Sequence, residues 1–410
     1  EAFGGIGKNC GNHPIANDFD TQAFIMDLST RKIQPITKDF HPTVSPLQWN
    51  HGDGCIYFNT DDGDCKNIYR YSPKDGKFEK LNLETDVTSA FALSEYNPGI
   101  AAYIGQSDYN AGVAYLYDMK KKTSSLLADP MKPILEKIEL GKTEPWNFTA
   151  SDGTVITGKM CLPPNFDPNK KYPMMVNFYE RNSETLYNYR MPEPHRSTID
   201  YHLYNSNEYI IFNPDIRYVD GYPGESCYNC LMPGVTMMIA KGYIDEKAIG
   251  AQGHSWGGYQ VAYLATRTDL FSAIESGAPV VNMFSAYGGI RWGSGMARSF
   301  QYEHTQSRLA ATPWSSPLRY LENSPLFTMD KVQTPILIMH NDADGHVPWY
   351  QGIEYFVAMK RLGKPCWLLN YTGEPHWPTN MANRIDFQRR MFQFFNHYLK
   401  NQKMPKWMSE

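Results

Sequence analysis

Ser255 lies at the centre of residues 253–258, GHSWGG, directly after the apolar residues 248–252 and before a run with helical periodicity. A G-x-S-x-G nucleophile needs this context, because a sharp turn between a strand and a helix lifts the serine hydroxyl clear of the sheet. The helix N-terminus then favours developing negative charge, and the backbone N–H of Trp256 would be one oxyanion donor. A Gly-rich turn can also serve packing alone. The strand, the doubled glycine and the helix together favour a nucleophile.

A serine hydroxyl needs a base, and that base needs a carboxylate to orient it. In the fold that carries this turn, the acid follows Ser255 on the loop after a later strand. The apolar residues 336–340 predict such a strand, and both Asp342 and Asp344 come directly after it. Their D-x-D-G spacing also occurs in calcium loops, but the closing glutamate of a calcium loop is missing. The loop therefore predicts a carboxylate partner, with two candidates.

Three histidines compete for the base. His340 ends the strand before the acid and His346 shares the acid's loop, whereas His376 follows a separate predicted strand at residues 366–371. The chain order Ser, Asp, His, each after its own strand, is typical of α/β-hydrolases. His376 is therefore the predicted base.

The elements that must hold these residues begin after Pro145. Two antiparallel strands are expected at residues 146–161 around an Asp-Gly turn, and alternation of strands and helices follows. The predicted strands are residues 173–179, 209–213, 248–252, 273–276, 335–340 and 366–371, and the predicted helices are 235–241, 259–267, 352–361 and 384–398. Such alternation predicts an α/β fold with a mostly parallel sheet covered by helices on both faces. Sites in these sheets lie at the carboxyl ends of the strands.

The first third of the chain has a different period. Three strand–turn–strand units recur around Asp27, Tyr71 and Asp118, which are 44 and 47 residues apart, with further strand candidates between them. That period is the size of one β-propeller blade. We therefore predict two domains: residues 1–140, about three blades forming the C-terminal part of a β-propeller, and residues 141–410, the α/β domain. A sandwich of unrelated hairpins is the alternative for the first.

Composition excludes some partners. The formal net charge is −4 and the pI is near 6.3, so no basic surface for nucleic acid is expected. The apolar runs are far shorter than the roughly 20 residues of a membrane-spanning helix. Seven cysteines indicate no disulfide framework, and Cys227 and Cys230 are interpreted as structural loop cysteines rather than a zinc or redox pair. The sequence does not indicate a cellular location or an oligomeric state.

These stretches together resemble the prolyl oligopeptidase family of serine peptidases, in which a β-propeller is joined to an α/β-hydrolase domain. The resemblance covers essentially the whole chain and lies in residues 151–154 (SDGT), 172–179 (YPMMVNFY), 215–218 (DIRY), 253–259 (GHSWGGY), 324–326 (SPL), 340–348 (HNDADGHVP) and 373–376 (GEPH). It implies that Ser255 is the nucleophile, that the acid is Asp344 rather than Asp342, and that His376 is the base. It also implies that Tyr179 is a second oxyanion donor, and that the propeller is incomplete at its N-terminus.

Two departures from the family affect the predicted substrate. Well-known members carry Arg or Asn two residues after the acid, where it holds a substrate carbonyl, whereas this chain has His346. The family's aromatic specificity pocket is less aromatic here, and we expect a hydrophobic pocket formed by Trp256, Val280 and Val347. Cleavage after proline is therefore not implied.

The resemblance predicts hydrolysis of short peptides through an acyl-enzyme on Ser255, with no metal and no organic cofactor. Two alternatives remain. The same triad would serve an esterase or another acyl hydrolase, because the fold alone does not choose the substrate. A non-catalytic, propeller-containing binding protein is the alternative from another class, and it would be expected to lack a complete triad.

Overall fold

The computed structural model describes residues 21–409, and the chain divides into two compact units. One unit contains Gly141–Asn182 and the chain from Pro192 onward. The other contains the described chain from residue 21 to Leu140 together with Ser183–Met191. Residues 1–20 of the predicted domain 1–140 lie outside the described residues.

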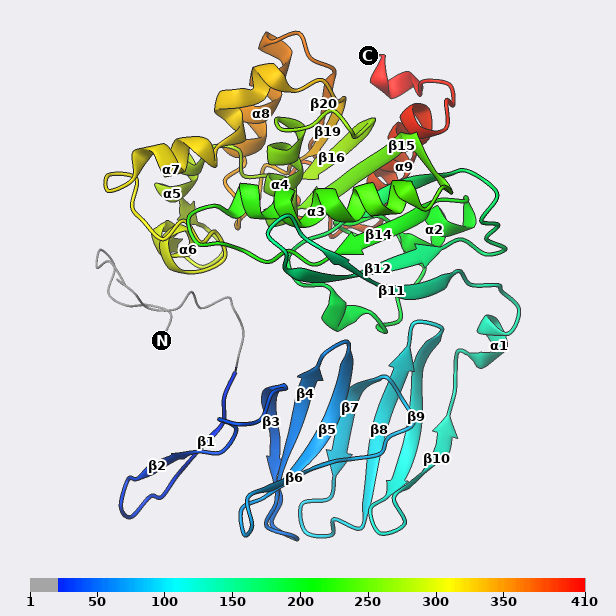
Figure 1. The fold of residues 1–410 in the computed structure, drawn as a ribbon, viewed down its shortest axis with the longest axis vertical. Helices are drawn as coiled ribbons and strands as arrows, with labels where there is room; N and C mark the ends of the chain where they lie inside the picture. Colours follow the sequence, from blue (N-terminus) through cyan, green and yellow to red (C-terminus); the bar gives the residue numbers. More distant parts are fainter. Residues whose placement is uncertain (1–20, 410) are drawn as a thin grey trace. The chain divides into compact units, whose positions relative to one another are not determined.

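The first unit is built on an eight-stranded sheet in the order β11-β12-β14-β13-β15-β16-β19-β20 (Figure 1). β11 and β12 pair antiparallel and β12 pairs antiparallel with β14, whereas all pairs from β14 to β20 are parallel. The predicted mostly parallel sheet is confirmed. The strands are β11 (Lys142–Thr149), β12 (Val155–Leu162), β13 (Tyr172–Asn177), β14 (Ile210–Pro214), β15 (Ile244–His254), β16 (Ala273–Gly277), β19 (Ile336–Met339) and β20 (Cys366–Leu369).

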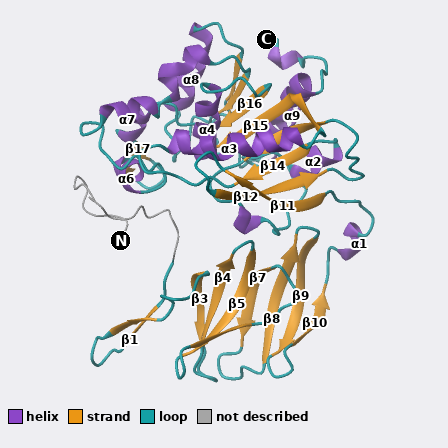
Figure 2. Ribbon diagram, viewed as in Figure 1, coloured by secondary structure: helices purple, strands orange, loops and turns teal. Residues whose placement is uncertain are grey.

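Helices cover both faces of this sheet, as Figure 2 shows in purple against the orange strands. α3 (Pro223–Ala240), α4 (Trp256–Ala265) and α8 (Tyr350–Arg361) pack on one face, and α2 (Tyr201–Ser206) and α9 (Met381–Leu399) on the other. Alternate residues of a strand therefore enter different cores: Val176 lies in the core under α3 and α4, and Met175 in the core under α2 and α9. Burial on both faces explains why these strands are continuous apolar runs.

The structure corrects the prediction for Cys227 and Cys230. Both lie inside α3, which begins at Pro223, well before the predicted helix at residues 235–241. The Gly/Pro-rich stretch suggested a loop, but proline is well tolerated in the first turn of a helix. Both thiols are buried and unbridged, and burial raises their pKa values. They are structural cysteines of a helix rather than of a loop.

Residues 283–331 form a set of short elements where we predicted no secondary structure. They are α5 (Met283–Tyr287), β17 (Ile290–Arg291), β18 (Met296–Ala297), α6 (Ser299–His304), α7 (Pro317–Glu322) and the 3-10 helix η2 (Pro325–Lys331). β17 and β18 pair as a short antiparallel hairpin. Elements this short carry too little hydrophobic periodicity to be predicted from the sequence.

The second unit contains two runs of four antiparallel strands, β3–β6 and β7–β10, joined by one bridge between Lys66 and Val87. A separate hairpin is formed by β1 (Phe24–Met26) and β2 (Ile33–Pro35). The three predicted strand–turn–strand units are confirmed as the hairpins β1–β2, β5–β6 and β9–β10. The other strands are β3 (Thr43–Trp49), β4 (Ile56–Asp62), β5 (Cys65–Ser72), β6 (Lys77–Lys80), β7 (Val87–Leu93), β8 (Ile100–Ser107), β9 (Asn110–Asp118) and β10 (Thr123–Ala128).

Three further short helices complete the secondary structure: α1 (Lys132–Leu135), η1 (Ser183–Thr185) and η3 (Lys406–Met408). Among the described residues, none of the helices has the length and apolar character needed to cross a membrane.

Candidate active site

Ser255 occupies a strained turn between β15 and α4, with φ 60° and ψ −113°. Its N–H donates to the carbonyl of Gly277 at 2.7 Å, which fixes the turn against the next strand. A side chain at Gly253 would lie 2.3 Å from the carbonyl oxygen of Gly257, and one at Gly258 would lie 2.4 Å from that of Gly277. A non-glycine residue at positive φ is a costly conformation that the surroundings must enforce. The predicted sharp turn after β15 is confirmed.

Asp344 follows β19 and receives four hydrogen bonds. Its Oδ2 lies 2.6 Å from Nδ1 of His376 and 3.2 Å from Nε2 of His340, and its Oδ1 accepts the N–H groups of His346 and Val347 at 2.8 and 2.9 Å. Burial alone would raise the pKa of Asp344, but the hydrogen bonds from the two histidines hold it well below its ordinary value. The buried carboxylate is therefore ionised and orients the His376 ring.

The other acid candidate, Asp342, has a different contact. It is exposed, and its Oδ1 accepts the N–H of Gly373 at 2.7 Å. Its neighbour Asn341 donates to a carbonyl of the same loop at 2.8 Å. Asp342 thus braces the loop that carries His376, and Asp344 is the carboxylate bonded to the His376 ring.

Glu374 anchors the loop of His376 to the start of α9. Its two oxygens accept the Thr379 N–H and hydroxyl at 2.7 and 2.6 Å, the Asn380 N–H at 3.0 Å and the Asn383 side-chain amide at 2.6 Å. Burial opposes ionisation, but these four donors lower the pKa of Glu374 to about 2. A carboxylate satisfied in this way at a helix N-terminus fixes the loop.

A buried chain of polar side chains crosses the sheet on the face covered by α2 and α9. The amide of Asn213 donates to the Tyr201 hydroxyl at 2.7 Å, and that hydroxyl donates to Asn177 at 2.7 Å. Asn177 donates to Gln252 at 2.5 Å, and Gln252 donates to Glu275 at 2.8 Å. Register pairs Asn177 with Gln252 and Gln252 with Glu275. The chain therefore ends at a carboxyl group on β16, one strand from the Ser255 turn.

Glu275 is fully buried, and burial raises its pKa to about 8, although its hydrogen bond from Gln252 acts in the opposite direction. A side chain at Gly277 would meet His254 Nδ1 at 2.5 Å and Glu275 Oε1 at 3.3 Å, so both atoms lie against the same glycine. The ring of His254 also contacts that of His376 edge to face, with centroids 4.7 Å apart. Burial lowers the pKa of His254. A neutral imidazole thus lies against the His376 ring.

The two predicted oxyanion donors lie beside the Ser255 turn. Tyr179 follows β13, and its hydroxyl accepts a hydrogen bond from Gln306 at 2.7 Å. Burial raises the pKa of Tyr179, and hydrogen bonds with Gln306 and the Ser255 side chain offset this in part, so the phenol keeps its proton. Gln260 of α4 holds the Tyr179 carbonyl at 2.5 Å. Trp256 begins α4, and N–H groups in the first turn of a helix lack an intrahelical acceptor.

The residues predicted to bind substrate are also near the site. The His346 ring stacks on the His376 ring, with centroids 4.9 Å apart and planes 24° apart. Val280 and Val347 pack in one cluster with Trp256 and are only 2 % and 4 % exposed. A substrate would therefore meet little of either valine unless the cluster opened. The substrate-binding role of these residues stays a prediction.

The site contains one group of side chains that could hold a metal ion. Asp344, His346 and His376 each offer a ligand atom, and these atoms lie within 4.8 Å of one another. A carboxylate with two imidazoles is a donor set that suits Zn²⁺.

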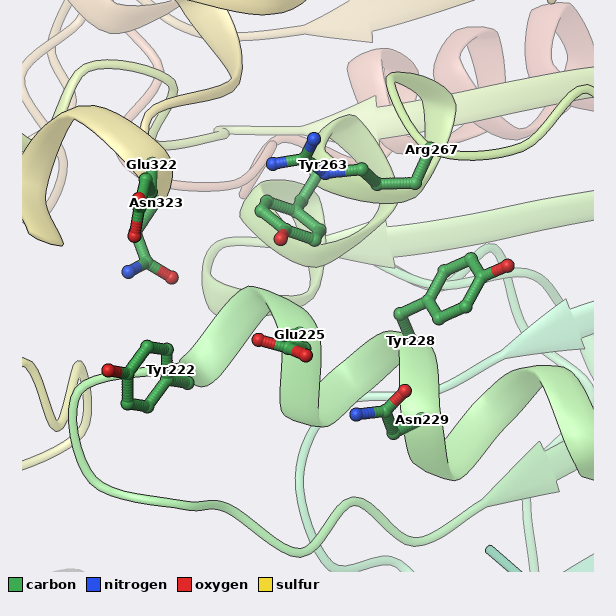
Figure 3. A pocket seen from close by; sticks show the side chains of 8 residues that line it. All are labelled: Tyr222, Glu225, Tyr228, Asn229, Tyr263, Arg267, Glu322 and Asn323. Carbon is green, nitrogen blue, oxygen red and sulfur yellow. The ribbon is translucent and has the colours of Figure 1, made fainter. Parts of the chain in front are cut away.

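A separate cavity of about 560 Å³ lies among α3, α4 and α7 (Figure 3). Three tyrosines and two glutamates line it, and the guanidinium of Arg267 lies 4.7 Å from the ring centroid of Tyr263. Its lining residues are Tyr222, Glu225, Tyr228, Asn229, Tyr263, Arg267, Glu322 and Asn323. These include none of the residues predicted from the sequence to do chemistry, so this cavity is not the candidate active site.

Sequence reasoning missed several supports of the site. His340 was weighed as a base, but its ring instead contacts Oδ2 of Asp344, the same oxygen that bonds His376. Arg298 was not considered; it is 1 % exposed and donates to the carbonyl of His346 and, at 2.8 Å, to the Tyr302 hydroxyl. His340 could have been found from its place at the strand end beside the acid. Arg298 lies within residues 283–331, where the sequence shows no recognisable pattern of secondary structure.

The strand order, the turn at Ser255 and the loops after β19 and β20 define the α/β-hydrolase fold. A profile of the prolyl oligopeptidase family matches residues 217–402, the stretch that contains Ser255, Asp344 and His376. This stretch therefore matches the prolyl oligopeptidase family, as the resemblance indicated.

Similarity to individual proteins extends over most of the chain. Dipeptidyl-peptidase 5 of Porphyromonas gingivalis is 25% identical over 401 residues, which are 92% of this chain and 55% of that protein. The solved structure of Pyrococcus horikoshii acylaminoacyl peptidase has a TM-score of 0.76 at 20% identity, covering 95% of this chain and 61% of that one. Porphyromonas gingivalis dipeptidyl peptidase 4 has a TM-score of 0.75 at 19% identity, covering 92% and 52%. The chain spans about half the length of the curated relatives it matches.

Proposed function

We propose that this protein is a serine peptidase that hydrolyses short peptides through an acyl-enzyme on Ser255. The family match over residues 217–402 and the similarity to proteins named dipeptidyl peptidases support a peptidase. The observation that carries the proposal is the strained Ser255 turn together with a buried, ionised Asp344 bonded to His376. These residue types in this chain order perform acyl transfer.

In the proposed mechanism His376 accepts the proton of Ser255 as the hydroxyl attacks the peptide carbonyl. Because Asp344 holds Nδ1 of His376, Nε2 is the nitrogen left to act as base. The same imidazolium then protonates the leaving amine. Water, deprotonated by His376, attacks the acyl-enzyme and releases the second product.

Negative charge that develops on the carbonyl oxygen would be met by two donors. The Tyr179 hydroxyl lies close enough to the Ser255 side chain to affect its own pKa, and Trp256, whose N–H is the second donor, begins α4. A preorganised pair of donors in a partly buried site stabilises an oxyanion more than water does. Removing one such donor typically costs roughly 100- to 1,000-fold in kcat.

We infer that residues 1–140 contribute about three blades of a β-propeller and that residues 141–410 form the peptidase domain. The two runs β3–β6 and β7–β10 support this, because four antiparallel strands make one blade. The hairpin β1–β2 would supply strands of a further blade.

The proposal is tested by turnover of a panel of aminoacyl and dipeptidyl amides, with short-chain esters as comparison. We expect amide hydrolysis that Ser255→Ala abolishes. Ser206→Ala is the matched control, because that serine is exposed on α2 and its hydroxyl contacts only a local carbonyl. Hydrolysis of esters with no hydrolysis of any amide would favour an acyl hydrolase and overturn the peptidase assignment.

A further inference from the structure

Two guanidinium groups lie beside the candidate active site without a carboxylate partner. Arg291 ends β17 and is half-buried, and Arg298 precedes α6 and is 1 % exposed, with its Nε lacking a hydrogen bond. In the part of the chain that the structure describes, neither arginine forms an ion pair with Asp or Glu. By contrast, the nearby Arg308 pairs with Glu180 at 2.7 Å. A buried cation without an anion is costly, so an arginine kept in this state indicates a ligand.

Arg291 is joined to the oxyanion side of the site by a chain of side chains. Its Nη1 donates to Gln301 at 3.4 Å, Gln301 donates to Gln306 at 3.1 Å, and Gln306 donates to the Tyr179 hydroxyl at 2.7 Å. One long contact uses little of the five-donor guanidinium. Arg291 therefore keeps donors for a further partner near Tyr179.

The hairpin that carries Arg291 is also fixed to the loop of the acid. The N–H of Gly293 donates to the carbonyl of Gly345 at 2.7 Å, and a side chain at Gly345 would lie 2.9 Å from the Gly293 nitrogen. Arg298, which follows the hairpin, is bonded to the His346 carbonyl. The turn of the hairpin and the residue that follows its second strand thus both contact the loop after Asp344.

The electrostatics around Arg291 agree with a missing anion. Burial and the charge of Arg298 lower the pKa of Arg291, while Tyr179 and Asp344 act in the opposite direction. The Asp344 carboxylate already interacts with two histidines, His376 and His340. An incoming carboxylate would therefore relieve repulsion between the two arginines.

We propose that Arg291, backed by Arg298, forms a carboxylate-binding subsite that selects peptides with a negative charge next to the bond attacked by Ser255. This inference rests on the proposed peptidase function. Two sources supply such a carboxylate: an acidic side chain on the acyl side of the bond, or the free carboxyl terminus of a short leaving group. A guanidinium binds either one as a planar, two-pronged donor.

The test compares isosteric substrates that differ only in charge. The first arm uses acetyl-Ala-Glu and acetyl-Ala-Gln aminomethylcoumarin amides. The second uses a dansyl tripeptide with a free or an amidated carboxyl terminus one residue after the cleaved bond. In wild type we expect kcat/KM to be roughly 10- to 100-fold higher for the charged member in one arm, from the strength of a charge-assisted hydrogen bond, and that arm identifies the source.

The readout for the arginine variants is the ratio of kcat/KM for the charged substrate to kcat/KM for the neutral one. A general loss of activity lowers both values and leaves this ratio unchanged, whereas loss of the subsite changes it. Arg291→Gln should bring the charged-to-neutral ratio to about 1, and Arg291→Lys should keep part of it, since lysine supplies a point charge without the fork. Arg267→Gln is the matched control and should keep the whole ratio, because Arg267 lines the separate cavity of Figure 3.

Each outcome is decisive. A wild-type ratio of 1 in both arms, or a preference that persists in Arg291→Gln, overturns the subsite while leaving the peptidase intact. A protein that hydrolyses no peptide contradicts the proposed function instead. In that case protection of Ser255 from a fluorophosphonate probe, by acetyl-Ala-Glu-amide against acetyl-Ala-Gln-amide, still tests the subsite.

Discussion

Replacing Glu275 by glutamine should stabilise the protein at neutral pH. Glu275 is fully buried, accepts one hydrogen bond from Gln252, and has a pKa raised to about 8 from an ordinary value of 4.5. Between pH 4.5 and 8 the unfolded chain loses this proton while the folded protein keeps it. Folding stability from this group is therefore fully present below pH 4.5 and falls as pH rises toward 8.

The size of the effect follows from the same values. Each pH unit above 4.5 costs about 1.4 kcal/mol of the free energy of unfolding until the folded group also ionises. The cost of Glu275 is then about 1 kcal/mol at pH 5 and about 3 kcal/mol at pH 7. Glutamine has nearly the same shape and can accept the Gln252 bond, but it does not titrate.

The assay is urea unfolding of wild type and Glu275→Gln at pH 5 and pH 7. We expect the variant to gain about 2 kcal/mol relative to wild type between the two pH values. Glu246→Gln, on an exposed position of β15, is the control and should follow the wild type. If the difference in the free energy of unfolding between Glu275→Gln and wild type does not change with pH, Glu275 is not protonated in the folded protein at neutral pH.

Three further outcomes are expected. Asp344→Asn should lower kcat by roughly 10⁴-fold through loss of His376 orientation, whereas Asp342→Asn should lower it far less; equal losses would refute the assignment of the acid. Acidification from pH 8 to pH 5 should lower kcat/KM, since a protonated imidazole cannot take the Ser255 proton; a flat profile would exclude a histidine base. Added Zn²⁺ should inhibit reversibly through His346 and His376, so a chelator should restore activity and His346→Asn should weaken inhibition; unchanged inhibition in that variant would place the metal elsewhere.

The sequence predicted the parts of the molecule that depend on strong local patterns. Long apolar strands buried on both faces and the doubled glycine around Ser255 are such patterns, because few alternatives satisfy them. The order of the loops after β19 and β20 followed from the fold that those strands imply. The choice between Asp342 and Asp344 could not come from spacing, because both follow the same strand. The family resemblance implied Asp344, and in the structure Asp344 is the carboxylate bonded to the His376 ring, whereas Asp342 accepts the Gly373 N–H.

The remainder could not be predicted because it arises from contacts between distant segments. The hairpin of Arg291 is short and is held by one backbone hydrogen bond to the acid loop and by the side chains that follow it. The polar chain ending at Glu275 joins four strands and α2, and each of its members taken alone resembles an ordinary strand or helix residue. Tertiary packing also overrode local composition at the start of α3, where Pro223 opens a helix instead of a loop.

The central claim is that Ser255 is the nucleophile, and labelling with a fluorophosphonate probe tests it most directly. The probe should modify one serine, and peptide mass mapping should place the modification on Ser255. Labelling should disappear in Ser255→Ala and persist in Ser206→Ala. Modification of a different residue, or undiminished labelling of Ser255→Ala, would contradict the proposed active site.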